Sequence, residues 1–300
     1  LGKYGLAEFV SHRPLLRRLS IPLTRSGGKH RPPRLVRENF GQRLRRALEE
    51  LGPTFIKLGQ ILSDRGDIIP EPVVREMKKL QDEVPPFPTE EAKRLVSESL
   101  GKPIDELFLY FYAEPEGAAS LAQVHRAILP TGQPVAVKIK RPAIEDQIYA
   151  DLEIMRQFAH FIDHYTNYFE VLSATEIIEE FETQITKEVD FIEEYLSVKK
   201  FAADYEDDRT ILVPQVYDEY SSRDVLVQEF INGKKVSEVI EGESDRFDKE
   251  RINLRTADFI MSQLFINGYF HADPHPGNFM VLEGDIICFI DYGMVYSLRP

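Results

Sequence analysis

The chain has 300 residues, of which 43% are hydrophobic and 29% are charged, and this composition is typical of a globular protein with two domains or one bilobal unit. Its single cysteine, Cys288, excludes an internal disulfide framework and indicates a reducing environment, and its apolar neighbours favour a buried structural thiol. No apolar run approaches the roughly 18 residues of a membrane-spanning helix, and nothing resembles a secretory signal.

The net charge of −13 is distributed unevenly along the chain. Residues 1–46 carry 12 Lys and Arg and 2 acidic residues, so the remainder has a net charge of −23. The acidic body excludes nucleic acid as a partner, because nucleic-acid-binding proteins present a basic surface. Residues 1–38 contain scattered prolines and are predicted to form an irregular basic arm. This arm fits either an anionic membrane surface or a solvated tail.

The segment 39–104 is predicted to be an N-terminal helical extension. Apolar periodicity predicts four helices in it, at residues 39–51, 53–65, 72–83 and 89–101. Lys57 and Gln60 are three residues apart in the second helix and lie on neighbouring positions of its surface. The extension precedes any strand pattern, so it is a part of the chain separate from the strand-rich region that follows.

The segment 105–232 carries most of the strand patterns. Runs of alternating or β-branched residues predict strands at 107–112, 121–129, 134–139, 211–217 and 224–230, with two long helices at 142–169 and 173–205. In the third strand, Lys138 points to the face opposite its apolar neighbours. The last segment, 233–300, contains a helix at 248–266 and a hairpin formed by residues 279–282 and 286–290.

The stretch His271–Gly293 carries the strongest indication of chemistry. Asp273 is followed five residues later by Asn278, and Asp291-Tyr292-Gly293 follows the hairpin. Protein kinases use this order for metal-assisted phosphoryl transfer, because hard oxygen ligands hold Mg²⁺ against the phosphates. Each motif alone could be a turn, but their order and spacing favour a phosphoryl-transfer site.

A second kinase-like pattern is Val135-Ala136-Val137-Lys138, whose lysine would pair with nucleotide phosphates. Such a lysine needs a carboxylate from a following helix, and the stretch 188–194 offers several candidates, among them Glu188, Asp190 and Glu194. In a continuous helix, Asp190 and Glu194 share a face that Glu188 does not share. A solvated acidic helix face is the alternative interpretation of any one of these residues.

Two departures from the protein-kinase pattern argue against ordinary protein-kinase activity. Where a glycine-rich loop would lie, residues 116–122 read Glu-Gly-Ala-Ala-Ser-Leu-Ala, so one glycine remains. Alanine has fewer positive-φ conformations than glycine, so this loop should approach phosphates differently. The catalytic loop reads His-Ala-Asp instead of His-Arg-Asp.

Taken together, these elements resemble the UbiB family of atypical kinases. The elements that carry the resemblance are Lys57-Leu58-Gly59-Gln60, the Ala-rich loop at 118–125, Lys138, Glu188-Val189-Asp190 and His271–Gly293. The resemblance covers about residues 40–295 in order. It implies an α+β, protein-kinase-like bilobal fold whose N-terminal helical extension packs over the cleft. Most of the helical C-lobe is absent from this sequence, which is best explained by truncation.

The resemblance also implies a role for each site residue. Asp273 would occupy the catalytic-base position, with Lys138 and Lys57 as further catalytic residues, and Asn278 and Asp291 would hold Mg²⁺. The residues implied in nucleotide binding are Ala118, Ala119, Ser120, Lys138, Glu194, Gln60, Glu188, Asp190 and Glu229. In this arrangement Lys57 and Gln60 line the cleft against Glu188 and Asp190, and Lys138 pairs with Glu194.

The function implied by the resemblance is that of a Mg²⁺-dependent kinase-like ATPase that binds ATP or ADP and supports the synthesis of ubiquinone or a related isoprenoid lipid. Its implied partners are a membrane surface, a lipid or quinone precursor and a lipid-biosynthetic protein complex. The protein would be membrane-associated on the cytoplasmic or organellar-matrix side. Two alternatives stay open. One is a small-molecule phosphotransferase of the aminoglycoside or choline type, which has no Lys-x-Gly-Gln helix. The other is a non-catalytic, nucleotide-gated regulator of a lipid-enzyme complex.

Overall fold

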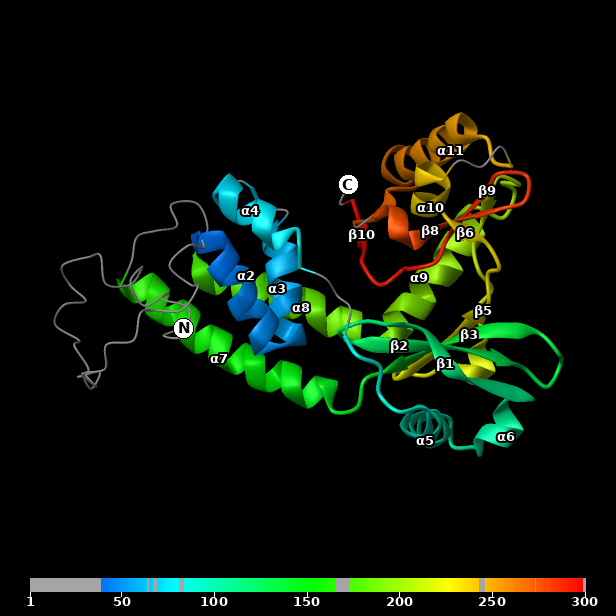
Figure 1. Ribbon diagram of the computed structural model, residues 1–300, viewed down its shortest axis with the longest axis horizontal. Helices are drawn as coiled ribbons and strands as arrows, with labels where there is room; N and C mark the ends of the chain where they lie inside the picture. Colours follow the sequence, from blue (N-terminus) through cyan, green and yellow to red (C-terminus); the bar gives the residue numbers. More distant parts are fainter. Residues whose placement is uncertain are drawn as a thin grey trace. The chain divides into compact units, whose positions relative to one another are not determined.

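The computed structural model describes residues 39–63, 65–66, 69–80, 84–165, 173–242, 246–272 and 274–298 (Figure 1). The chain divides into two compact units. Unit 1 consists of Leu1–Glu83 and Glu145–Phe181, and unit 2 consists of Val84–Ile144 and Glu182–Pro300. The predicted basic arm lies outside the described residues, and the predicted division at residues 38, 104 and 232 stays a prediction about domain organisation.

Unit 1 is built from helices. They are α2 (Phe40–Leu51), α3 (Pro53–Ser63), α4 (Glu71–Met77), α7 (Ile144–Tyr165) from Glu145 onward, and the first half of α8 (Ala174–Val189). The first three enclose an apolar core of Leu48, Ile56, Val73, Met77 and Leu80. Gly59 lies at a close helix contact, because a Cβ there would collide with Leu80 and lie 2.8 Å from Leu48 Cδ1. The glycine of the Lys-x-Gly-Gln pattern therefore permits close packing of α3.

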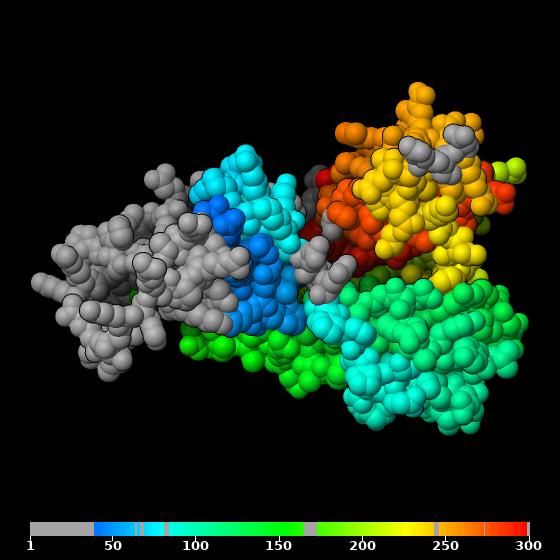
Figure 2. All heavy atoms as spheres, in the orientation of Figure 1, coloured from blue at the N-terminus to red at the C-terminus, as the bar shows by residue number. Residues whose placement is uncertain are grey.

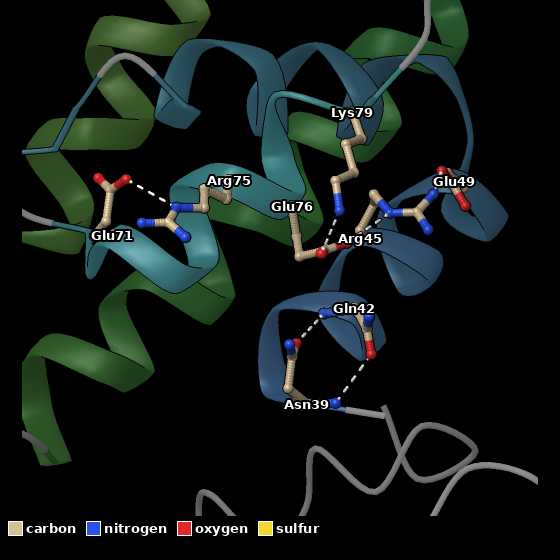
Figure 3. A network of polar contacts seen from close by, with 8 residues as sticks. All are labelled: Asn39, Gln42, Arg45, Glu49, Glu71, Arg75, Glu76 and Lys79. Carbon is tan, nitrogen blue, oxygen red and sulfur yellow. Dashed lines mark hydrogen bonds and ion pairs between the residues drawn. The ribbon is translucent and has the colours of Figure 1, made fainter. Parts of the chain in front are cut away.

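Polar contacts join α2 and α4 (Figure 3). Asn39 and Gln42 form a reciprocal capping box at the start of α2, with N···O distances of 2.9 and 3.1 Å. The Glu76 carboxylate on α4 is 8% exposed, and it accepts hydrogen bonds from Lys79 Nζ at 2.6 Å and from Arg45 Nε at 3.4 Å. Since Arg45 belongs to α2, this carboxylate links the two helices.

Two carboxylates of α7 anchor other parts of unit 1. Asp151 Oδ2 accepts a hydrogen bond from the buried Thr54 hydroxyl at 2.6 Å, which links α7 to α3. Asp163 accepts from the backbone amides of Ala174 and Thr175 at 2.8 and 2.9 Å. These bonds satisfy amides at the start of α8 that have no partner within the helix.

Unit 2 begins with α5 (Thr89–Leu100) and α6 (Ile104–Leu107), followed by an antiparallel sheet in the order β1-β2-β3-β5. The strands of this sheet are β1 (Tyr110–Ala118), β2 (Ala122–Ile128), β3 (Pro134–Lys140) and β5 (Val225–Glu229). One face of β3 is apolar and packs with α5 in a core cluster that includes the fully buried Val135, Val137 and Ile139. Lys138 lies on the other face, opposite Leu226 of β5 in the register.

The C-terminal part of unit 2 contains α9 (Phe191–Asp204) and a second four-stranded sheet in the order β4-β9-β8-β6. Its strands are β4 (Ile211–Leu212), β6 (Lys234–Lys235), β8 (Phe279–Leu282) and β9 (Ile286–Phe289), while β7 (Tyr269–His271) pairs with β10 (Val295–Ser297). The remaining helices are α10 (Val236–Glu241) and α11 (Lys249–Ser262), with the short helical turns η4 (Asp218–Tyr220), η5 (Gln263–Asn267) and η6 (Pro276–Asn278). The predicted hairpin at 279–290 is confirmed.

An aromatic core holds this part together. Ring contacts with centroid distances of 5.0–6.3 Å join Phe201, Phe259, Phe289 and Tyr292. Cys288 is fully buried in β9, as predicted, and burial raises the pKa of its thiol. In the part of the chain that the structure describes, no helix has the length and apolar character that crossing a membrane requires.

The prediction of one continuous helix at 173–205 is wrong. Helix α8 ends at Val189, and α9 begins at Phe191. Asp190 between them has an extended backbone, with φ −95° and ψ 101°, and its carboxylate accepts a hydrogen bond from Ile192 N–H at 3.1 Å as the N-cap of α9. Arg223 Nε lies 3.2 Å from the same carboxylate. The N-cap hydrogen bond and the ion pair with Arg223 therefore stabilise the interruption between α8 and α9.

Other elements differ from the prediction at their ends. Strand β1 begins later than the predicted strand 107–112 and continues to Ala118, with register shifts on both sides of Pro115 that let a proline lie in this edge strand. Helix α4 covers only the first half of the predicted 72–83, because Leu80 N–H turns back to the Met77 carbonyl. Of the predicted strand 211–217, only β4 and a bridge from Val216 to Gln228 are present.

Candidate active site

The site is centred on a lysine of β3 in unit 2. Lys138 Nζ lies 2.7 and 3.0 Å from the two carboxylate oxygens of Glu194, and 4.0 Å from Asp291 Oδ1. The side chain of Glu194 is 4% exposed and that of Lys138 is 25% exposed. The ion pair implied by the sequence is therefore present, and it joins the first sheet to α9.

The position of Glu194 follows from the helix break at Asp190. Because α9 starts at Phe191, Glu194 lies in its first turn, and Phe191 is fully buried with its ring centroid 5.3 Å from Lys138 Nζ. Burial alone would lower the pKa of Lys138, but the charges of Glu194 and Asp291 outweigh it, so the pKa is raised. The lysine is therefore held in its charged form.

Asp291 and Gly293 form the next part of the site. Asp291 follows β9, its side chain is 43% exposed, and its Oδ1 accepts a hydrogen bond from Gly293 N–H at 3.1 Å. A Cβ at Gly293 would lie 3.4 Å from Asp291 Oδ1 and 3.9 Å from both Glu188 Cγ and Glu194 Oε2. Three acidic side chains therefore lie near Gly293, and Lys138 contacts two of them, Glu194 and Asp291.

Asn278 lies beside this cluster through its backbone. It is half-buried at the end of η6, and its carbonyl accepts a hydrogen bond from Ile290 N–H at 3.0 Å. This bond brings Asn278 next to Ile290, the residue that precedes Asp291. Asp273, the implied catalytic base, lies outside the described residues, so its role stays a prediction.

The Ala-rich loop closes the turn between β1 and β2. Ala118 ends β1, and Ala119 N–H donates to the Ala122 carbonyl at 2.8 Å. Ser120 is fully buried, and its hydroxyl has no hydrogen-bond partner within the described part of the chain. A buried hydroxyl without a protein partner fits a site completed by a ligand oxygen.

The remaining implied residues have other surroundings. Lys57 and Gln60 are half-buried in α3 of unit 1, where Gln60 Nε2 donates to the Leu80 carbonyl at 3.4 Å. Their implied position against Glu188 and Asp190, which belong to unit 2, stays a prediction.

Glu229 ends β5, and its Oε2 accepts a hydrogen bond from Gln215 N–H at 3.3 Å. Gln228, the residue before Glu229, was not identified from the sequence as part of the site. Its Nε2 donates to the Ile290 carbonyl at 3.4 Å, which links β5 to the segment that carries Asp291. Alternation along β5 was the available signal, since Gln228 lies two residues from Leu226, which faces Lys138 in the register.

This arrangement suits a phosphorylated ligand and a divalent cation. Lys138 presents a fixed positive charge, and Asp291 and Asn278 carry the carboxylate and amide oxygens that Mg²⁺ prefers. The described residues contain no group of three or more His, Cys, Asp or Glu side chains that could hold a metal ion. Figure 2 shows the sheet atoms of unit 2 in green beneath the yellow, orange and red atoms of its C-terminal part, and these are the two parts that Lys138 and Asp291 join.

Comparison with known proteins places the chain in a family. Residues 79–300 match the ABC1 atypical kinase-like domain. A Marinobacter nauticus protein named "Probable protein kinase UbiB" is 38% identical over 278 residues, which cover 89% of this chain and 49% of that protein. The Arabidopsis thaliana "Protein ACTIVITY OF BC1 COMPLEX KINASE 7, chloroplastic" is 37% identical over 256 residues, which cover 85% of this chain and 37% of that protein. The chain thus spans half or less of the length of these two relatives.

A solved structure is also similar to this chain. A Mycobacterium tuberculosis protein in complex with erythromycin is 30% identical and superposes with a TM-score of 0.63, covering 84% of this chain and 63% of that one. The mixture of helices and sheets is consistent with the α+β, kinase-like fold expected from the sequence. Because the domain match covers most of the chain and UbiB proteins are 36–38% identical over the aligned residues, the chain belongs to the UbiB family of ABC1 atypical kinases.

Proposed function

We propose that this chain binds ATP or ADP with Mg²⁺ and acts as a kinase-like ATPase. The observation that carries the proposal is the contact of Lys138 with both Glu194, at 2.7 Å, and Asp291, at 4.0 Å. Kinase sites need a lysine held by a carboxylate together with an Asp that precedes a glycine, and these residues have that arrangement here.

Each residue has a distinct task in this proposal. Lys138 would bind and orient the α- and β-phosphates, and the Ser120 hydroxyl would donate a hydrogen bond to a phosphate oxygen. Asp291 and Asn278 would hold the magnesium ion, with Asp273 at the position of the catalytic base. Bound Mg²⁺ would supply neutralisation of the phosphate charge.

We further propose that the protein supports synthesis of ubiquinone or a related isoprenoid lipid at a membrane, on the cytoplasmic or organellar-matrix side. The family resemblance supports this role. The excess of 12 Lys and Arg over 2 acidic residues within 1–46 supports contact with anionic lipid. The partners would be a lipid or quinone precursor and a lipid-biosynthetic protein complex.

One observation favours the alternative of a nucleotide-gated regulator without turnover. Both backbone groups of Ala119 have protein partners, because its N–H donates to Ala122 and its carbonyl accepts from Arg141 Nε at 2.7 Å. A loop with fewer available amides supplies less stabilisation to a transferring phosphate. The presence of helix α3 ahead of the first strand favours both of these functions over a small-molecule phosphotransferase.

Calorimetry tests the proposal. We expect Mg²⁺-ADP and Mg²⁺-ATP to bind the parent chain and to give no binding heat with Asp291→Asn. Asp258→Asn, which removes one exposed carboxylate of α11, is the matched control and should bind like the parent. Unchanged affinity in Asp291→Asn would contradict the proposed site.

Phosphate release distinguishes the ATPase from the regulator. The assay uses the 300-residue chain with anionic vesicles and a quinone-like phenol. Release above background that disappears in Asp291→Asn supports the ATPase. Background release, with nucleotide binding still measured by calorimetry, supports the regulator.

A further inference from the structure

Arg141 lies at the end of the first sheet and contacts the Ala-rich loop through both its backbone and its side chain. Its N–H donates to the Leu121 carbonyl at 2.9 Å, and its Nε donates to the Ala119 carbonyl at 2.7 Å. These bonds hold Arg141 against the turn that carries Ser120. A change in this turn must therefore move the guanidinium or break the bond to Ala119.

The same guanidinium contacts a second segment, Val84–Pro88. Arg141 Nη2 donates to the Pro85 carbonyl at 3.1 Å and to the Val84 carbonyl at 3.3 Å. Its central carbon lies 5.7 Å from the centroid of the Phe87 ring. A planar guanidinium can serve two segments at once because its donors point in fixed, different directions. A lysine has a single ammonium and cannot reproduce this fork.

A glutamine of β2 also holds Val84–Pro88. Gln123 Oε1 accepts from Phe87 N–H at 2.8 Å, and its Nε2 donates to the Phe87 carbonyl at 3.1 Å. Gln123 is fully buried and lies opposite Ala118 in the register of β1 and β2. Both clamps on the segment thus come from residues tied to the Ala-rich loop, since Gln123 belongs to it and Arg141 is hydrogen-bonded to it.

Arg141 also lies where the chain passes between its two units. Val84 is the first residue of unit 2, and Ile144, three residues after Arg141, is the last residue before the chain returns to unit 1. The connection is a tight turn in which Ile144 N–H reaches the Arg141 carbonyl and Ala143 adopts φ +57°, a left-handed conformation that alanine rarely adopts. Two covalent connections between the units therefore meet at this arginine.

We propose that Arg141 is a positioning residue that couples the Ala-rich loop to Val84–Pro88, so that nucleotide bound under the loop changes the surroundings of Phe87. This inference rests on the proposed nucleotide site. Coupling is reciprocal, so loosening the segment must in turn weaken nucleotide binding. Through this coupling, nucleotide binding affects the segment Val84–Pro88, which follows the last residue of unit 1 along the chain. All the bonds involved lie within unit 2.

The absence of tryptophan from the chain provides a direct reporter. Phe87→Trp preserves an aromatic ring at a half-buried position and supplies the only indole fluorescence. Emission is measured with and without saturating Mg²⁺-ADP in Phe87→Trp alone and combined with Arg141→Ala, Arg141→Lys or Arg94→Ala. Arg94 is the matched control, because its partners Glu91 and Glu98 lie on its own helix. Calorimetry on the same proteins measures binding separately.

We expect an emission change in Phe87→Trp and in its Arg94→Ala variant, and loss of most of that change with Arg141→Ala and with Arg141→Lys. Arg141→Ala should also weaken Mg²⁺-ADP binding on the order of tenfold. An undiminished emission change in Phe87→Trp combined with Arg141→Ala, at saturating Mg²⁺-ADP, would overturn the coupling. The coupling would also be overturned if Phe87→Trp binds nucleotide by calorimetry but its emission does not change. No binding heat in the parent would instead overturn the proposed function, and the coupling with it.

Amide exchange without the tryptophan reporter gives a second measurement. Phe87 N–H donates to Gln123, so its exchange rate reports how often this hydrogen bond opens. We expect Mg²⁺-ADP to slow this exchange in the parent and to leave it unchanged in Arg141→Ala. Equal slowing in both proteins would overturn the coupling.

Discussion

Lys138 Nζ is shared between the two carboxylate oxygens of Glu194, at 2.7 and 3.0 Å, and this pair joins strand β3 to helix α9. Breaking a buried pair leaves one charge without its partner, which costs about 3 kcal/mol or more. We expect Lys138→Met and Glu194→Gln each to lower the free energy of unfolding. The loss in the double variant should be smaller than the sum of the two single losses. Urea denaturation of the parent, both single variants and the double variant measures this coupling. Additive losses would show that the pair contributes no coupling to stability.

Ala118→Gly should change the preference between ATP and ADP. Glycine permits positive φ, which costs alanine ~1–2 kcal/mol, so the loop gains conformations that can shift the ratio of the two affinities by up to about tenfold. Calorimetry with both nucleotides gives the ratio. Ala113→Gly, at an exposed position of the same strand, is the control and should keep the parent ratio. An unchanged ratio of the two affinities in Ala118→Gly would contradict this prediction.

Glu76→Gln should destabilise unit 1, whereas Glu71→Gln should not. Glu76 is 8% exposed and serves both Lys79 and Arg45, while Glu71 and Arg75 form a pair whose side chains are 66% and 74% exposed (Figure 3). Losing a charged hydrogen-bond acceptor at a buried position costs about 1–3 kcal/mol, and an exposed pair contributes less than about 1 kcal/mol. Thermal or urea unfolding compares the two variants directly. Equal effects would contradict the assigned role of Glu76.

His125 should make stability depend on pH. Gln123 Oε1 accepts from Phe87, so its Nε2 is the donor toward His125 Nε2 at 2.7 Å, and the imidazole Nδ1–H must donate to the Tyr112 carbonyl at 3.0 Å. The ring is therefore neutral. Burial lowers the pKa of His125, the bond to Tyr112 opposes this shift, and the charge of Lys93 adds to it.

The sign of the pH effect follows from that direction. The unfolded chain, with a histidine pKa of about 6.5, binds this proton more readily than the folded chain, so stability is retained above about pH 6.5 and is lost as the pH falls below it. Urea denaturation at about pH 7.5 and about pH 5 should show a larger loss in the parent than in His125→Gln. His275→Gln, at an exposed histidine, should keep the parent's loss. The same loss in His125→Gln and the parent would rule this mechanism out.

Local patterns predicted the parts of the fold that local forces determine. The hairpin at 279–290 needs only alternating apolar residues and a turn, and Lys138 faces away from its neighbours because strands alternate. The break at Asp190 could not be predicted this way, because apolar periodicity continues on both sides of it. What interrupts the helix is a side-chain cap and an ion pair with Arg223, a residue far along the chain.

The candidate site shows the same limit. Residue types at 188–194 gave several possible partners for Lys138, and only the family resemblance selected Glu194. The structure explains that selection, since the helix restarts at Phe191 and turns Glu194, but not Asp190, toward the lysine. Arg141 was not identified because the hydrogen bonds that link it to Ala119, Val84 and Pro85 go to backbone carbonyls, which leave no trace in the sequence.

The burial of Cys288 has a practical consequence for following this protein in solution. Its thiol is enclosed in β9 and stays protonated, so maleimide dyes and spin labels should leave the native chain unmodified. A cysteine introduced at an exposed position, such as Asp258→Cys, would then take up a label at one defined place without removal of the natural residue.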